Sequence, residues 1–133
     1  MQQRNIYIID DDLVSQFATR YCIQQYEEHF TISTCTNAEE ALVTLSSLLL
    51  EEEDFPDIIF LDLVMGGMSG WDFLDNLKNL SRSKKMPDIY ILSAFANSKD
   101  RAIAKKHNLI KGYIDKPLSK NSLDKIFKVK VSI

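Results

Sequence analysis

The sequence has few of the features that mark membrane, secreted or metal-thiolate proteins. Its two cysteines, Cys22 and Cys35, lack the short spacing of a metal site, so we expect buried thiols in a reducing compartment. No apolar run approaches the ~20 residues needed to cross a bilayer. The N-terminus leads directly into a predicted strand and shows no signal peptide. These absences predict a cytoplasmic protein that does not bind membranes.

Repeats, low-complexity segments and linkers are absent as well, so residues 1–133 are expected to form a single domain. The charge of this chain is unevenly distributed. Residues 1–98 contain 16 acidic side chains and 6 Lys or Arg, a net charge of −10, whereas residues 99–133 contain 10 Lys or Arg and 3 acidic side chains, a net charge of +7. Because few aromatic residues are interleaved with these lysines, the pattern favours a solvated basic face over a nucleic-acid site.

Apolar runs typical of buried strands alternate with amphipathic helical patterns. Strands are predicted at 6–9, 31–35, 58–61, 89–92 and 113–114, with a helix after each. The residues predicted to bury one face of these helices are Leu13, Val14, Phe17, Ala18, Tyr21 and Cys22; Ala38, Ala41, Leu42, Leu45, Leu48 and Leu49; Trp71, Leu74 and Leu77; Ala102 and Ile103; and Leu123, Ile126 and Phe127. Asn37 and Ser119 are predicted to cap two of the helices. This alternation predicts an α/β fold with a doubly wound, five-stranded parallel sheet.

Polar residues follow four of the predicted strands at the point where each strand ends. The acidic cluster Asp10–Asp12 follows the first strand and Asp62 follows the third. Ser93 ends the fourth strand and Lys116 follows the fifth. In the strand order 2-1-3-4-5 these four strands are adjacent, and their carboxyl ends meet at one edge of the sheet. We therefore expect all of these side chains to converge on a single crevice.

Such a group of carboxylates requires a compensating positive charge. At 4 Å, two like charges repel by about 4 kcal/mol at an effective dielectric constant of 20. Lys116 is one source of compensation and Mg²⁺, which prefers oxygen ligands, is another. Zinc is not favoured, because His29 and His107 lie away from this edge. A carboxylate beside Mg²⁺ and lysine suits nucleophilic attack by Asp62 on phosphorus, with the Ser93 hydroxyl contacting a phosphoryl oxygen.

Five segments of the chain resemble the receiver domain of two-component response regulators, over the range Ile6 to Phe127. They are Ile8-Ile9-Asp10-Asp11-Asp12, Phe60-Leu61-Asp62-Leu63-Val64-Met65, Met68-Ser69-Gly70-Trp71, Leu92-Ser93-Ala94 and Gly112-Tyr113-Ile114-Asp115-Lys116-Pro117. The resemblance implies a flavodoxin-like fold and a signalling protein rather than an enzyme. Such a protein accepts a phosphoryl group from a histidine kinase or phosphotransfer protein and then contacts a downstream protein. Because six residues follow Phe127, we expect a stand-alone receiver similar to chemotaxis regulators.

The resemblance also implies a role for each residue of the acidic site. Asp62 matches the phosphoacceptor of the family, and Asp10 and Asp11 match its acidic pair. By this correspondence Asp11 binds Mg²⁺ directly and Asp10 holds a metal-bound water. Asp62 and the backbone carbonyl of Val64 complete the set of protein ligands.

A second group of residues matches the switch of the family. Ser93 and Lys116 match the hydroxyl and the lysine that bind the phosphoryl group, and Lys116–Pro117 is expected to be a cis peptide. Tyr113 matches the switch aromatic, which can rotate into the space that Ser93 vacates. The surface that changes would be the last two helices and the strand between them. This is also the basic part of the chain, and we hypothesise that it docks an acidic partner.

One position departs from the family pattern. The family usually has proline after the Met of the phosphorylation loop, whereas this chain has Gly66 followed by Gly67. Glycine lacks the fixed φ of proline and increases the entropy of the unfolded chain. The departure predicts a more mobile loop and a weaker affinity for Mg²⁺.

Two other functions are compatible with parts of the pattern. A small phosphohydrolase of the haloacid dehalogenase type would use Asp10 as its nucleophile. That family requires Asp-x-Asp-x-Thr, and Asp10-Asp11-Asp12-Leu13-Val14 lacks the threonine. The other alternative is an interaction module that keeps the receiver fold but works without phosphorylation.

Overall fold

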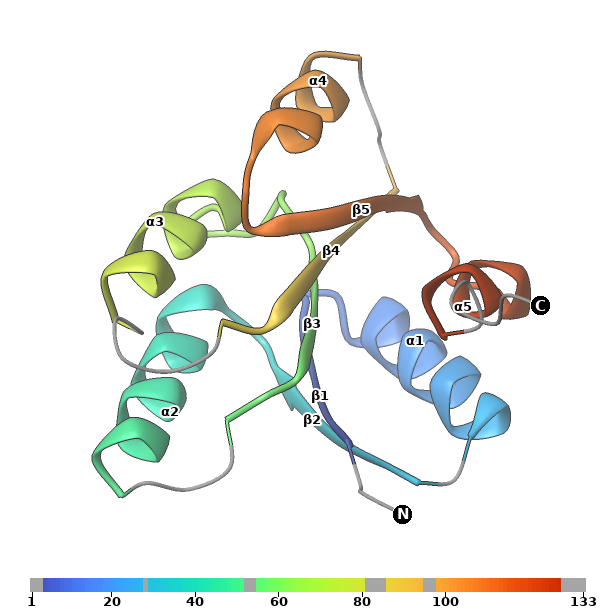
Figure 1. Cartoon of the computed structure of the whole chain (residues 1–133), viewed down its shortest axis with the longest axis horizontal. Helices are drawn as coiled ribbons and strands as arrows, with labels where there is room; N and C mark the ends of the chain where they lie inside the picture. The colour runs from blue at the N-terminus through green and yellow to red at the C-terminus, as the bar shows by residue number, and fades with distance from the viewer. Residues whose placement is uncertain (1–3, 28, 52–54, 81–85, 95–97, 128–133) are drawn as a thin grey trace, which may run out of the picture.

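Five parallel strands alternate with five helices in the computed structural model, which describes residues 4–27, 29–51, 55–80, 86–94 and 98–127 (Figure 1). The strands are β1 (Arg4–Ile9), β2 (Phe30–Cys35), β3 (Ile58–Leu61), β4 (Asp88–Ser93) and β5 (Ile110–Asp115). They pair in the order β2-β1-β3-β4-β5, and every neighbouring pair is parallel. The predicted fold and strand order are confirmed, although β5 is longer than the predicted 113–114.

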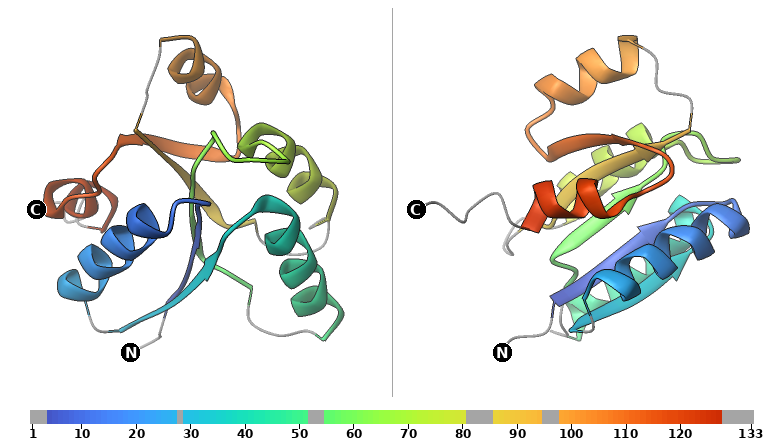
Figure 2. Two further views of the ribbon diagram at one scale, coloured as in Figure 1. Left: turned by 180° about the vertical axis from the view of Figure 1, so that it is seen from behind. Right: turned by 90° about the vertical axis from the view of Figure 1, so that its right-hand side faces the viewer.

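Helices cover both faces of the sheet. They are α1 (Leu13–Tyr26), α2 (Ala38–Leu50), α3 (Gly70–Leu80), α4 (Ser98–Lys106) and α5 (Lys120–Phe127). Helices α1 and α5 lie on one face, and α2 and α3 lie on the other (Figure 1; Figure 2). Helix α4 packs against β5 at the edge of the sheet. In the described part of the chain, every helix is too short or too polar to span a bilayer.

Each face of the sheet has its own hydrophobic core, because successive side chains of a strand point to opposite faces. Ile9 and Leu61 belong to the core under α2 and α3, whereas Ile8 and Phe60 belong to the core under α1 and α5. All four residues of β3 are buried, since this strand is the centre of the sheet. The residues that directly follow β1 and β3 are thus positioned by the buried centre of the sheet.

Side-chain caps fix the start of the first two helices. Asp12 Oδ1 accepts hydrogen bonds from two backbone N–H groups in the first turn of α1, at 3.0 and 3.3 Å. Asn37 Oδ1 accepts one from the Glu40 N–H at 2.7 Å, which confirms the predicted cap of α2. The Glu40 carboxylate in turn accepts the Thr36 N–H at 3.1 Å, one residue before the position of a standard reciprocal cap.

The prediction that the apolar stripe of α1 is buried was wrong. Its exposed members are Leu13, Val14, Phe17, Ala18 and Tyr21. The buried residues of α1 are instead Thr19 and Ile23. The inward face is polar at its start because Ser15 lies beside Asp10 and donates a hydrogen bond to its carboxylate at 2.7 Å. Periodicity identified an apolar face, but it did not reveal which face the sheet requires.

The other helices follow their predicted patterns more closely, with one exception. On α4 the predicted Ala102 and Ile103 are exposed, and Ala104 is buried instead. The predicted positions of α2 and α5 are all buried or half-buried. On α3, Phe73 joins the core, and Trp71 is only half-buried. Helix α4 is short and basic and packs on a single edge strand, so little of its surface can be buried.

Gly70 is expected to be essential for stability. A Cβ at this position would lie 2.8 Å from both the Asp62 carbonyl oxygen and the Leu63 Cα, and backbone atoms cannot easily move aside. We expect Gly70→Ala to lower the free energy of unfolding by about 1–3 kcal/mol in urea denaturation. Gly66→Ala is the matched control, since a Cβ there would meet only Asp11 Oδ2 at 3.9 Å. Equal losses in the two variants would contradict this expectation.

Candidate functional site

The carboxyl ends of β1 and β3 place two aspartates side by side. Asp10 directly follows β1 and Asp62 directly follows β3. The Asp62 N–H donates to the Ile9 carbonyl at 3.0 Å, so the pairing of the two strands continues up to the carboxylates. The exposed fractions are 2% for Asp10 and 8% for Asp62. Acidic residues are rarely buried to this degree without a partner, so the pair requires charge compensation.

Asp11 completes a group of three carboxylates. One oxygen from each of Asp10, Asp11 and Asp62 lies within 4.8 Å of the other two. Asp11 is exposed, so the group opens to solvent on its side. Asp12, which the sequence placed in the same cluster, is used to cap α1 instead.

The Asp10 carboxylate is held by donors on both of its oxygens. Oδ1 accepts the Asp12 N–H at 3.0 Å, and Oδ2 accepts the Ser15 hydroxyl at 2.7 Å and Lys116 Nζ at 2.9 Å. Gln16 Nε2 donates to the Asp10 carbonyl at 3.1 Å and to the last carbonyl of β2 at 3.2 Å. Ser15 and Gln16 were not predicted as site residues, because polar residues in the first turns of a helix are common and carry no spacing signal.

Lys116 links the two buried aspartates. Its Nζ lies 2.9 Å from Asp10 Oδ2 and 3.1 Å from Asp62 Oδ2, and its side chain is 14% exposed. Burial alone would lower the pKa of Lys116, but its hydrogen bond and attraction to Asp10, and then to Asp62, raise that pKa above its usual value. The side chain is therefore held as an ammonium ion between two carboxylates.

The charge of the group is not balanced by this lysine alone. Burial raises the pKa of Asp62 above its usual value, and the charge of Asp10 adds to this effect, whereas the Val64 N–H and Lys116 oppose it. Among the residues that the structure describes, three carboxylates face one ammonium ion, and their oxygens are close enough to share a cation. Carboxylate oxygens are ligands that Mg²⁺ prefers in proteins. The donor set therefore fits a divalent cation of this type.

Ser93 and Val64 lie at the same edge of the sheet. Ser93 is the last residue of β4 and is buried, and its backbone carbonyl accepts the Lys116 N–H at 2.9 Å. The Val64 N–H donates to Asp62 Oδ1 at 3.1 Å, and the Val64 side chain is exposed. The structure thus brings the predicted metal and phosphoryl residues to one edge. The expected cis Lys116–Pro117 peptide is present.

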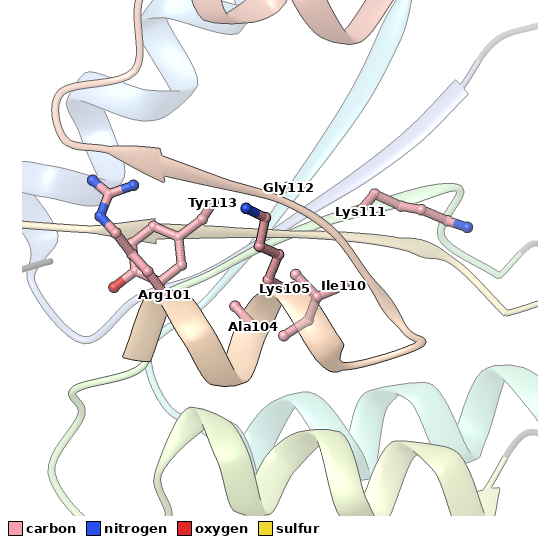
Figure 3. Close-up of a pocket in the computed structure, with 7 residues that line it drawn as sticks. All are labelled: Arg101, Ala104, Lys105, Ile110, Lys111, Gly112 and Tyr113. Atoms are coloured by element: carbon pink, nitrogen blue, oxygen red, sulfur yellow. The ribbon is translucent and has the colours of Figure 1, made fainter. Parts of the chain in front are cut away.

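Tyr113, the predicted switch residue, lies on β5 under a side chain of α4. The guanidinium carbon of Arg101 lies 4.8 Å from the centre of the Tyr113 ring, and Arg101 also forms an ion pair with Asp115. Arg101 and Tyr113 line a cavity of about 350 Å³ between α4 and β5 (Figure 3). The Tyr113 hydroxyl is buried and has no hydrogen-bond partner among the described residues. Since such a hydroxyl is costly, a rearrangement that gives it a partner would be favourable.

Comparison with known proteins places this geometry in context. The chain is 28% identical over 118 residues to an uncharacterized 14.6 kDa protein in the sodA1 3′ region of Leptolyngbya boryana, with 89% of this chain and 82% of that protein covered. A two-component response regulator from Cytophaga hutchinsonii has a similar structure, with a TM-score of 0.87, 25% identity and 97% of each chain covered. The structure of a CheX–CheY–BeF3–Mg complex from Borrelia burgdorferi shares the fold, with a TM-score of 0.75, 23% identity and 98% and 92% of the two chains covered.

A family model agrees with these similarities. The model described as the response regulator receiver domain matches residues 6–128, which is nearly the whole chain. The match includes β1 from Ile6 onward, the whole of the other four strands, and each carboxylate of the acidic group. Together with the strand order 2-1-3-4-5, it assigns the chain to a family: this protein is a member of the response regulator receiver domains.

Proposed function

We propose that Asp62 accepts a phosphoryl group from a histidine kinase or a phosphotransfer protein in a Mg²⁺-dependent reaction that the domain assists. Receiver domains are signalling domains of two-component systems, and they generally bind Mg²⁺ at an acidic pocket. The observation that carries the proposal is the position of Lys116, with Nζ 2.9 Å from Asp10 and 3.1 Å from Asp62. This position supports the proposal, because the carboxylate that would act as the nucleophile lies beside a cation that can bind phosphoryl oxygens.

The chemistry follows from the groups around Asp62. The residues that would hold the metal ion are Asp10, Asp11, Asp62 and Val64, the last through its carbonyl oxygen. Bound Mg²⁺ would neutralise charge on the phosphoryl oxygens. An Asp62 oxygen attacks phosphorus, the bond from phosphorus to the donor histidine nitrogen breaks, and its electron pair stays on the imidazole. Lys116 and the Ser93 hydroxyl bind the oxygens of the transferred group, which lowers the energy of the transition state.

The exposed stripe on α1 supports docking of the phosphodonor next to this site. It begins at Leu13, directly after the capping residue Asp12, and continues to Phe17 and Tyr21, whose rings stack at 6.5 Å. Tyr21 also lines a groove of about 620 Å³ between α1 and the segment that leads into α5. A partner that carries phosphohistidine must reach Asp62 at this edge of the sheet. An apolar helix of that partner would cover the stripe.

The face formed by α4, β5 and α5 is suited to a different partner. Arg101, Lys105 and Lys111 line the cavity beside Tyr113 (Figure 3). Lys120 and Lys125 add positive charge on α5. Opposite charge on a partner would speed association and fix its orientation. We assign this face to a downstream protein with an acidic surface.

Covalent phosphorylation tests the proposed role of Asp62. With Mg²⁺ and a small acyl phosphate, intact-mass spectrometry should show the gain of one phosphoryl group in the natural protein and none in Asp62→Asn or after chelation of the metal. Lys116→Ala is expected to slow the reaction by about 10²-fold, because a preorganised cation is lost. The hydrolase alternative predicts continuous release of phosphate that survives Asp62→Asn and is abolished by Asp10→Asn. That result would replace the proposal.

The burial of Asp62 predicts a pH-dependent stability in the metal-free protein. Its pKa is raised by folding, so the stabilising contribution of the protonated form is lost as the pH rises from the unfolded pKa through the folded one. Above the folded pKa the ionised carboxylate costs stability, and in that pH range Asp62→Asn should raise the urea midpoint in EDTA. Mg²⁺ at 100 times its Kd should stabilise the natural protein by about 2.7 kcal/mol. An Asn variant no more stable than the natural protein in EDTA would contradict this.

The two docking surfaces predict reciprocal effects of substitution. Phe17→Ser should lower kcat/KM for phosphotransfer from a purified phosphohistidine protein by about 10-fold, since an exposed aromatic anchor is lost. Lys111→Glu should leave this transfer unchanged, but it should weaken binding of a downstream partner and reduce the salt dependence of that binding.

The controls separate docking from chemistry. Both variants should be phosphorylated by a small acyl phosphate at the natural rate, because neither Phe17 nor Lys111 contacts the acidic group. Val43→Ser on α2 removes an apolar side chain that is 68% exposed, similar to the 71% of Phe17, and it should change neither assay. An equal decrease of kcat/KM for phosphotransfer in Phe17→Ser and Val43→Ser would contradict the assignment of α1 as the docking surface.

A further inference from the structure

The segment that follows Asp62 is held by carboxylates from two other elements. The Gly66 N–H donates to Asp11 Oδ2 at 3.0 Å, and the Met68 N–H donates to Glu39 Oε2 at 3.3 Å. Asp11 follows β1, and Glu39 lies in the first turn of α2. The segment between Asp62 and α3 is therefore hydrogen-bonded to the loop after β1 and to the first turn of α2. It also contains the Val64 carbonyl, the only backbone group that the family resemblance assigns to the metal ion.

These contacts depend on the glycines at the position where the family usually has proline. A proline at position 66 has no N–H and could not donate to Asp11. Gly67 has φ of +79°, in the left-handed region that favours glycine. A Cβ on Gly67 would lie 3.1 Å from Glu39 Oε2, so the glycine also lets this carboxylate approach the backbone. The chain thus replaces the covalent restraint of proline with two hydrogen bonds to carboxylates.

We propose that Glu39 is a positioning residue for the metal-dependent phosphorylation of Asp62. Its hydrogen bond to Met68 orders the segment 64–68, and with it the Val64 carbonyl, before the metal ion binds. Without this restraint, the segment must become ordered when Mg²⁺ binds, and the entropic cost of that ordering lowers the affinity for Mg²⁺. The inference rests on the proposed function, because it assigns the metal site to the phosphorylation reaction.

A competing explanation is that Glu39 acts only through its negative charge, which attracts a cation from a distance. The two explanations differ in the effect of glutamine at this position. Glu39→Gln removes the charge but keeps a carbonyl oxygen that can accept the Met68 N–H. Positioning therefore predicts that Gln restores the natural behaviour, whereas a charge effect predicts that Gln and Ala are equally damaging.

Mg²⁺ binding to the full chain, measured by calorimetry, is the primary test. Glu39→Ala should raise the Kd for Mg²⁺ by about 3–10-fold, the range expected for loss of one hydrogen bond of ordinary strength, since this bond is 3.3 Å long and exposed to solvent. Glu39→Gln should stay within about 2-fold of the natural protein, since a neutral acceptor keeps most of the bond. Acyl phosphate assays should show the same shift in the Mg²⁺ concentration for half-maximal rate, with the rate at saturating Mg²⁺ changed by less than about 2-fold.

Glu40→Ala is the matched control. It removes the same charge from the next residue of the same helical turn, and it breaks a hydrogen bond to Thr36 rather than to the loop. This variant should lose thermal stability and keep its affinity for Mg²⁺. An equal loss of Mg²⁺ affinity in Glu39→Ala and Glu40→Ala, or in Glu39→Ala and Glu39→Gln, would overturn the proposal.

Amide hydrogen exchange in EDTA tests the restraint without any metal. The Met68 amide should exchange faster in Glu39→Ala than in the natural protein or in Glu40→Ala. Unchanged exchange at Met68 would overturn the inference even if Asp62 is phosphorylated normally. Failure of the natural protein to bind Mg²⁺ or to gain a phosphoryl group would instead contradict the proposed function, so the two failures are distinguishable.

Discussion

The bridge from Lys116 to Asp10 and Asp62 is the interaction on which the rest of the site depends. Two carboxylates are buried at adjacent strand ends, and their repulsion in a low-dielectric environment would disfavour the fold without a nearby cation. Lys116 directly follows β5, which lies two strands away from β3. One ammonium ion cannot balance three acids. The remaining negative charge would favour binding of the divalent cation that the proposed function requires, so incomplete compensation is consistent with that function.

The support of Asp10 explains why the inward side of α1 begins with polar residues. The first turns of α1 face the sheet with Ser15 and Gln16, which hold the side chain and the backbone of Asp10. The apolar residues of these turns lie on the outer side of α1, where Phe17 is 71% exposed. A contiguous exposed apolar stripe commonly marks a surface that binds a partner. Because it starts beside the acidic pocket, the same helix that orients an acid of the site also presents the surface that we propose a phosphodonor recognises.

Local patterns predicted the fold and the main site residues because both follow from short segments. The apolar run Ile58–Leu61 is typical of a buried strand, and a polar residue directly after it must lie at the edge of the sheet. The strand order 2-1-3-4-5 then predicted that Asp10, Asp62 and Lys116 converge, because the strands that they follow end at one edge of the sheet. Glu39 could not be predicted in this way, since it meets Met68 across 29 residues and no spacing rule connects them. The exposure of α1 was missed for a related reason: periodicity fixes which residues share a face, and only tertiary packing decides where that face points.

Under the proposed function, strand β5 would carry a change at the acidic pocket to the basic face. Lys116 contacts the buried acids, Asp115 pairs with Arg101 of α4, and Tyr113 lies under the same guanidinium. The backbone of β5 is hydrogen-bonded to β4 and cannot shift without breaking that pairing, so the side chains must carry the change. A phosphoryl group on Asp62 would draw Lys116 and Ser93 toward itself and open space behind Ser93. The Tyr113 hydroxyl is buried without a partner in the described part of the structure, so it gains by moving. Its movement would remove the surface on which Arg101 rests. Helix α4 packs mainly against β5, and it is therefore the element whose position depends most on that contact.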